Sequence, residues 1–155
     1  MLSLTGHNYI GGERRAAGTV EHKSLDASSG EALPYTFIQA TPEEVDAAAQ
    51  AAAAAYPTYR NLSAVRRAEF LEAIADEIDA LGDDFVALVC RETALPAARI
   101  QGERGRTSGQ MRLFAKVLRR GDFYGARIDR ALPDRQPLPR PDLRQYQIGV
   151  GPVAV

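Results

Sequence analysis

The chain has 155 residues, 45% hydrophobic and 25% charged, a balance typical of a soluble globular protein long enough for one domain with a core. With 19 basic and 20 acidic residues the net charge is −1, which argues against nucleic acid or an anionic membrane as a partner. A single cysteine, Cys90, excludes an intramolecular disulfide and a zinc site built from cysteines. The start of the chain lacks the pattern of a signal peptide and no apolar run is long enough to span a bilayer, so we expect a cytoplasmic protein.

The first forty residues are predicted to form strands and turns. Residues 8–12 have the pattern of a short strand that enters a glycine turn, with residues 19–22 as the candidate return strand. Residues 26–31 are a dense cluster of turn formers, and residues 35–40 form the next extended run. A small β region is therefore expected ahead of the helices.

A helix is predicted to begin after Thr41, whose hydroxyl can cap the first amides. Pro42 suits the first helical position, and Glu44 stands where a capping box requires it. The alanine-rich run that follows favours helix, and we expect Pro57 to end it.

Two further helical segments follow. Ser63 is the expected cap of the second, which has an apolar stripe at spacings of three and four between residues 71 and 81. Gly82 interrupts it, and a shorter helix is expected to run on to Thr93. A long helix is predicted over residues 97–119, ended by Gly121.

The last thirty residues change character. Residues 123–130 and 144–148 are predicted to be strands on either side of a proline-rich segment, 132–142. Residues 153–155 have the apolar composition of the start of a buried parallel strand. We therefore expect these 155 residues to be one part of a larger fold.

Two candidate motifs carry little functional weight. Residues 149–154 match G-x-G-x-x-A, but a dinucleotide fingerprint opens a helix, and here a β-branched run follows the glycines. Cys90 lies on a predicted helix after apolar residues, and Arg91 points about 100° away from it. A thiol buried in the core or an interface is the preferred interpretation, and Cys90 is not expected to be a nucleophile.

Arg106 is the candidate binding residue. On a helix, Arg99, Glu103, Arg106 and Gln110 share one polar stripe because they are spaced by four, three and four. One interpretation is a solvated face with salt bridges. The other is an arginine that binds a carboxylate through two hydrogen bonds, with Gln110 beside it.

The order of several short motifs resembles the N-terminal third of the NAD(P)-dependent aldehyde dehydrogenase superfamily. These motifs are N-Y-I-G-G at 8–12, D-A-S-S-G-E at 26–31, T-P-E-E-V-D-A-A at 41–48, the helical segment 62–78, R-E-T-A-L-P at 91–96 and G-V-G-P-V-A-V at 149–155. Residues 102–115 and 129–144 are similar to the alpha-ketoglutaric semialdehyde (2,5-dioxovalerate) dehydrogenase subgroup. Ala94 departs from the family's usual glycine, and Gly149 stands where many members have proline.

The resemblance implies oxidation of a semialdehyde to its acid, with hydride passing to NAD+ or NADP+. The reaction would proceed by thiolate attack, hydride transfer and thioester hydrolysis. It also implies that the catalytic cysteine, the general-base glutamate and the cofactor loop lie after the strand that begins at Gly151. No catalytic or cofactor-binding residue is therefore expected here, and these residues alone should be inactive and bind no cofactor. Arg106 and Gln110 would line the substrate tunnel and suit a keto-acid semialdehyde.

The implied architecture is an incomplete α/β domain. Residues 1–120 would be the N-terminal part of the cofactor-binding domain, 121–149 the β-hairpin of an oligomerisation arm, and 150–155 the start of the first buried strand of the dinucleotide-binding sheet. A homo-oligomer is expected, and helices without their sheet should expose apolar faces. The alternative is a truncated, non-catalytic assembly or interaction module.

Overall fold

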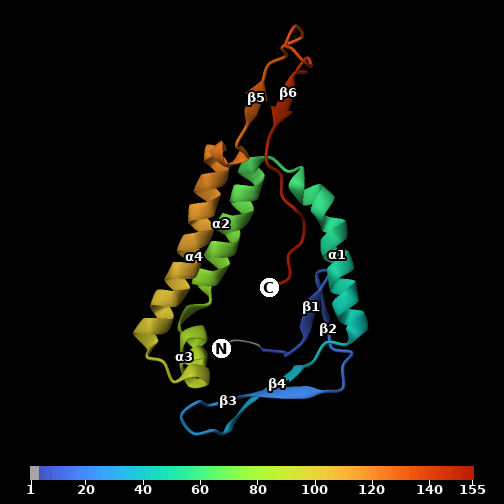
Figure 1. The fold of residues 1–155 in the computed structure, drawn as a ribbon. Helices are drawn as coiled ribbons and strands as arrows, with labels where there is room; N and C mark the ends of the chain where they lie inside the picture. The colour runs from blue at the N-terminus through green and yellow to red at the C-terminus, as the bar shows by residue number, and fades with distance from the viewer. Residues whose placement is uncertain (1–3) are drawn as a thin grey trace.

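The structure, a computed structural model, describes residues 4–155 and has an α/β composition with an open, tent-like shape. Two long antiparallel helices stand together on one side and the first helix stands apart on the other, with a hairpin projecting from the apex (Figure 1). The helices are α1 (Pro42–Arg60), α2 (Ala64–Ala80), α3 (Gly82–Thr93) and α4 (Ala97–Arg120). The strands are β1 (Asn8–Ile10), β2 (Glu13–Arg15), β3 (Glu21–Leu25), β4 (Ala32–Ile38), β5 (Arg127–Asp129) and β6 (Leu143–Gln145).

The β region of the first forty residues is present, but its pairing differs from the prediction. Strand β1 returns at once through Gly11 and Gly12 to β2, instead of pairing with residues 19–22. Both glycines have positive φ (61° and 86°), which allows a two-residue hairpin turn. Residues 21 and 22 belong to β3, which pairs with β4 around the predicted turn at 26–31.

The start of α1 is as predicted, and its end is not. The Thr41 side chain accepts a hydrogen bond from the Glu44 amide (3.2 Å), and the Glu44 carboxylate accepts one from the Thr41 amide (3.0 Å). The helix continues through Pro57 to Arg60. Since Pro57 lies in the last turn, its missing N–H removes one bond without stopping the chain, and the Asn61 amide group caps the Pro57 carbonyl at 2.8 Å.

The core lies mainly between α2 and α4, whose contact uses small side chains. Ala68 and Ala75 of α2 and Ala115 of α4 are fully buried, and Ser108 is 2% exposed. Small residues let the two backbones approach closely, because little volume separates them. Because this contact buries one face of α4 against α2, it also determines which face of α4 points away from α2. The candidate residues Arg106 and Gln110 lie on that second face.

Salt bridges reinforce the same contact. Arg112 reaches Asp76 and Asp79 on α2 at 2.7 and 2.8 Å, and Arg119 donates two hydrogen bonds to Glu72. The pKa of Asp79 is lowered, chiefly by its hydrogen bond with Arg112. These pairs hold the two helices in register along their length.

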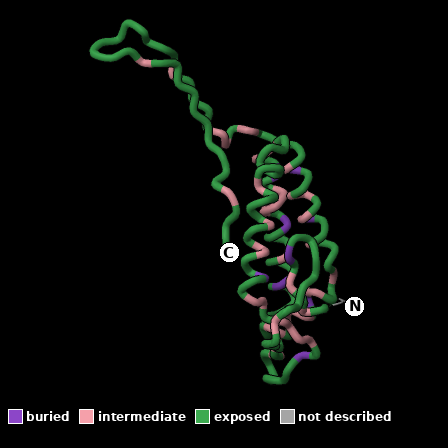
Figure 2. Tube along the Cα trace, turned by 90° about the vertical axis from the view of Figure 1, so that its right-hand side faces the viewer, coloured by how far each residue is buried: buried purple, intermediate pink, exposed green. Residues whose placement is uncertain are grey.

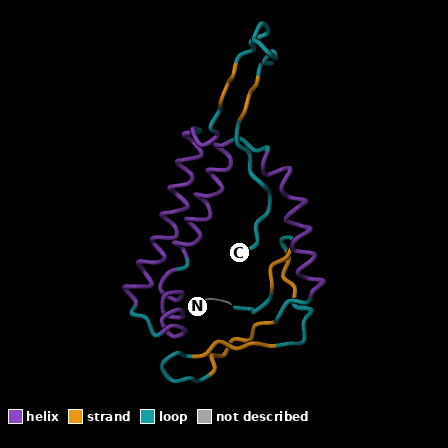
Figure 3. The backbone as a smooth tube through the Cα atoms, viewed as in Figure 1, coloured by secondary structure: helices purple, strands orange, loops and turns teal. Residues whose placement is uncertain are grey.

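The C-terminal hairpin forms, with shorter strands than predicted. Residues 122–124 make a turn of 3-10 helix, η1 (Asp122–Tyr124), where a strand was expected. Gly121 and Gly125 flank it with positive φ (77° and 54°), which turns the chain before β5 begins. β5 pairs with β6, and the proline-rich segment between them is a loop at the tip of the projection (Figure 3).

The chain after β6 runs back along one side of the helices, as Figure 2 shows, without forming a strand within residues 4–155. Val150 and Val153 are 94% and 73% exposed, so the buried strand expected here is not formed by these residues by themselves. Exposed residues dominate much of the trace (Figure 2). Large apolar side chains on α2 and α4, such as Phe70, Leu113 and Phe114, are about half exposed, as expected for helices without a covering layer.

Candidate functional site

Helix α4 presents Arg106 on the face opposite its contact with α2. Ser108 and Ala115 are buried against α2, and Arg106 precedes Ser108 by two residues, a rotation of about 200° on a helix. Arg106 is exposed, and Gln110, one turn further on, is half-buried. The predicted polar stripe is therefore present and faces away from α2.

The stripe is neutralised at one end only. Arg99 pairs with Glu103 across one helical turn, with nitrogen–oxygen distances of 2.9 Å from Nε and 2.8 Å from Nη2. The solvated, salt-bridged interpretation therefore holds for these two residues. Glu103 is occupied by Arg99, and Arg106 has no ion pair or hydrogen bond within residues 4–155.

Arg106 differs in this respect from every other arginine of α4. The helix carries six arginines, and five have a partner in the structure. Those five are Arg99 with Glu103, Arg104 with the Gly82 carbonyl, Arg112 with Asp76 and Asp79, Arg119 with Glu72, and Arg120 with Asp122. The planar fork of Arg106 is thus the one on this helix that is free to receive a carboxylate.

Gln110 has an unmet hydrogen-bonding group. Its side-chain oxygen is shielded from water and has no donor within the described residues. Leaving such an acceptor unpaired costs about 1–3 kcal/mol, so a donor supplied from outside these residues would be favoured there. Arg106 and Gln110 lie about 6 Å apart along the helix axis, within reach of one small ligand.

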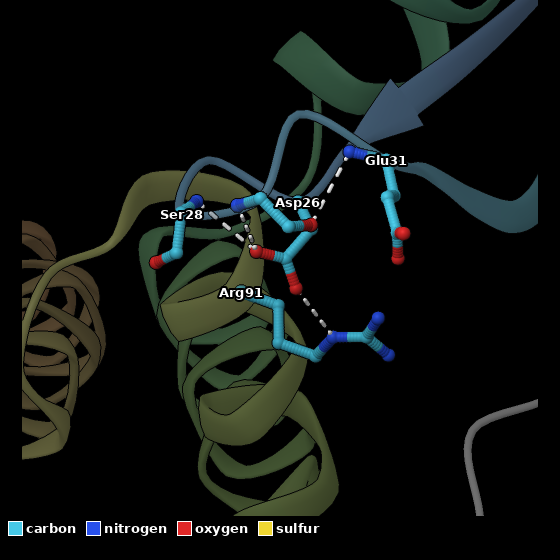
Figure 4. A network of polar contacts seen from close by, with 5 residues as sticks. Asp26, Ser28, Glu31 and Arg91 are labelled. Atoms are coloured by element: carbon cyan, nitrogen blue, oxygen red, sulfur yellow. Dashed lines mark hydrogen bonds and ion pairs between the residues drawn. The ribbon is translucent and has the colours of Figure 1, made fainter.

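A polar network that the sequence did not predict joins the β3–β4 turn to the end of α3 (Figure 4). Asp26 accepts hydrogen bonds from the amides of Ser28 (3.0 Å) and Ser29 (3.3 Å) and from Nε of Arg91 (3.1 Å). The Arg91 side chain, followed by the Ser28 amide, lowers the pKa of the Asp26 carboxyl. The turn itself was predicted from its composition, but its partner lies 65 residues away in the chain.

Other candidate chemistry is absent from the described residues. Cys90 is a half-buried free thiol, and His22 only shares a hydrogen bond with Gln39. Within residues 4–155 no group of three or more histidine, cysteine, aspartate or glutamate side chains could hold a metal ion. The helices in this range are all too short or too polar to cross a membrane.

The glycine motif at 149–154 forms no helix of its own, and all of its residues except Gly151 are exposed. A pyrophosphate is bound by the free amides of a helix N-terminus. We therefore assign no cofactor contact to residues 149–154.

Comparison with known proteins identifies the family. Residues 17–138 match the model of the aldehyde dehydrogenase family. The chain belongs to this family. It is 54% identical over its whole length to an alpha-ketoglutaric semialdehyde dehydrogenase of Acinetobacter baylyi and 48% identical over 99% of its length to alpha-ketoglutaric semialdehyde dehydrogenase 2 of Azospirillum brasilense.

The fold agrees with this assignment. The structure of succinate-semialdehyde dehydrogenase from Burkholderia pseudomallei superposes with a TM-score of 0.72 at 28% identity, over 84% of this chain and 26% of that one. The chain spans 30% of the length of the two curated aldehyde dehydrogenases. The resemblance seen in the sequence is confirmed, and so is its closer similarity to the semialdehyde dehydrogenases.

Proposed function

We propose that these residues are the N-terminal part of an NAD(P)-dependent aldehyde dehydrogenase that oxidises a keto-acid semialdehyde to the acid. The observation that carries the proposal is the 54% identity with an alpha-ketoglutaric semialdehyde dehydrogenase over the whole chain. NAD(P) would accept the hydride, and the residues that hold it and the catalytic cysteine and glutamate would lie outside these 155. What this chain would contribute is scaffold and substrate recognition.

Arg106 and Gln110 are proposed to recognise the substrate's carboxylate. A keto-acid semialdehyde carries a carboxylate at the end opposite the reactive aldehyde, and Arg106 is the α4 arginine without a partner in the structure. Its fork can hold both carboxylate oxygens, while a Gln110 amide turned outward donates a further hydrogen bond. Recognition at the acid end would fix the distance from the substrate's aldehyde to the nucleophile.

A chimera tests this proposal. Residues 1–155 replace the corresponding segment of the Acinetobacter baylyi relative, and Arg106→Ala is introduced in the chimera. Losing hydrogen bonds to a charged group costs about 1.5–3 kcal/mol, so KM for the keto-acid semialdehyde should rise by about tenfold or more. The KM for a neutral aldehyde of similar length should stay unchanged, because it has no carboxylate to lose.

Arg99→Ala is the matched control. It removes an arginine from the same stripe, but one that Glu103 already neutralises, so KM for the acidic substrate should hold. Equal KM values for the acidic substrate with and without Arg106 would refute the recognition role. A chimera that folds and binds NAD(P) but oxidises no aldehyde would refute the enzymatic proposal itself.

The exposed apolar side chains favour a second function, an assembly module without catalysis. Phe70, Leu113 and Phe114 could pack against another chain, and the hairpin β5–β6 projects clear of the helices (Figure 1). This reading predicts an inactive chimera that still forms the relative's oligomer. Size-exclusion chromatography with light scattering, run beside the activity assay, separates the two functions.

A further inference from the structure

A cleft lies near the apex of the fold, and neither Arg106 nor Gln110 is among its lining residues. It has a volume of about 710 Å³ and is formed by the end of α1, the start of α2, η1 and the segment that returns from the hairpin. This volume is within the range of about 300–1,000 Å³ that small-molecule sites occupy. The substrate recognition proposed above, by Arg106 and Gln110, involves none of the residues that line this cleft.

Aromatic rings line much of this cleft. Four tyrosines and one phenylalanine come from three separate parts of the chain, namely Tyr56 and Tyr59 of α1, Phe123 and Tyr124 of η1, and Tyr146 after β6. Phe123 and Tyr124 lie against each other with ring centroids 4.2 Å apart. Such walls favour a flat, apolar ring as occupant, because aromatic faces stack on one another.

The charged side chains that line the cleft are all positive. Arg60 and Arg67 are its charged lining residues, and no aspartate or glutamate is among them. Arg60 lies over the ring of Tyr56, 5.4 Å from its centroid, and has no acidic partner within residues 4–155. The cleft therefore presents two cations without the anions that nearby arginines such as Arg66 and Arg119 have.

Arg67 is held in place but incompletely bonded. Its Nη2 donates to the Tyr124 hydroxyl at 2.9 Å. Its Nε is shielded from water and has no acceptor within the described residues. A guanidinium that is fixed by one bond and lacks a counter-ion is a pre-organised site for an oxyanion.

The returning segment is anchored across the cleft at two points. The Gln147 amide donates to the Tyr124 carbonyl at 2.8 Å, and the Tyr56 hydroxyl donates to the Gly149 carbonyl. These bonds tie residues far apart in sequence into one wall. The cleft is thus built by contacts among its own lining residues.

From this combination we infer that the cleft binds an aromatic carboxylate. The ring would lie among the tyrosines, and the carboxylate would accept hydrogen bonds from Arg60 and Arg67. Each part of the ligand meets its complement: an apolar wall for the ring and an uncompensated cation for the acid group.

Titration of the 155-residue chain with 4-hydroxybenzoate, followed by amide chemical shifts, tests the inference. Shifts should concentrate at Tyr146, Gln147 and Gly149 and saturate with concentration. Benzyl alcohol supplies the ring without the acid and acetate the acid without the ring, so each should bind at least about tenfold more weakly if one charged contact or one stacked ring is lost.

Two variants locate the site. Arg60→Ala removes an exposed cation and should weaken 4-hydroxybenzoate binding by about tenfold, equivalent to about 1.4 kcal/mol. Arg127→Ala on β5 removes another exposed arginine, one outside the cleft, and should leave binding unchanged. Equal binding by both variants, equal affinity for benzyl alcohol, or no saturable shifts would each overturn the inference.

Discussion

Replacing Ala94 by glycine should stabilise the chain. Ala94 ends α3 in the left-handed conformation (φ 56°, ψ 17°), with its amide donating to the Cys90 carbonyl at 2.8 Å. A residue with a Cβ pays about 1–2 kcal/mol in this conformation, whereas glycine has no such strain. Glycine loses about 0.4–1 kcal/mol through the greater freedom of the unfolded chain. The net gain is therefore about 0.5–1 kcal/mol, or about 1–4 °C in Tm for a chain of this length.

Guanidinium unfolding followed by circular dichroism at one fixed protein concentration measures the change. The matched control is Ala87→Gly, the same substitution at an exposed position inside α3. There glycine only weakens the helix, by about 1 kcal/mol. The two variants should thus shift stability in opposite directions, and a loss at both positions would refute the argument from left-handed strain.

Two further perturbations test other parts of the fold. The pKa of Asp26 is lowered below its ordinary value of 3.8, so its carboxylate stabilises the fold above that pH and loses this effect as pH falls through the lowered pKa. Unfolding midpoints measured between about pH 2 and 6 should therefore fall towards acid in the original chain and fall less in Asp26→Asn; identical profiles would contradict the role of the Arg91 pair. Thr41→Ala should cost about 1 kcal/mol through loss of the α1 cap while Thr41→Ser retains most of it, and equal losses would show that the hydroxyl does not act as the cap.

Local signals in the sequence predicted the helices well because capping is a short-range effect. Thr41, Ser63 and Gly121 each act within four residues of the helix end that they define. Pro57 misled the prediction, because its missing N–H removes only the hydrogen bond to the carbonyl four residues earlier, and the helix still continues to Arg60. Its position relative to the true end could not be read from composition.

Strand pairing was harder to predict because it depends on the turn as well as on the strands. The run at 8–12 has the composition of a strand, but two adjacent glycines with positive φ choose the partner by returning the chain immediately. The apolar residues at 153–155 show that strand composition is not sufficient without a partner strand. They have the composition of a buried strand, but a strand forms only where a neighbour offers its backbone, and none does so within residues 4–155.

The candidate site shows which part of a functional prediction a single sequence can carry. Helical spacing alone placed Arg99, Glu103, Arg106 and Gln110 on one stripe, and the structure confirms that arrangement. Spacing could not tell which arginine stays free, because most of the neutralising groups come from other elements, as with Asp76 and Asp79 of α2 for Arg112. Only the fold shows that Asp76 and Asp79 lie on the side of α4 that packs against α2, whereas Arg106 lies on the opposite side. The case for Arg106 as a carboxylate-binding residue therefore rests on the hydrogen-bonding partners that the other five arginines of α4 have and Arg106 lacks within residues 4–155.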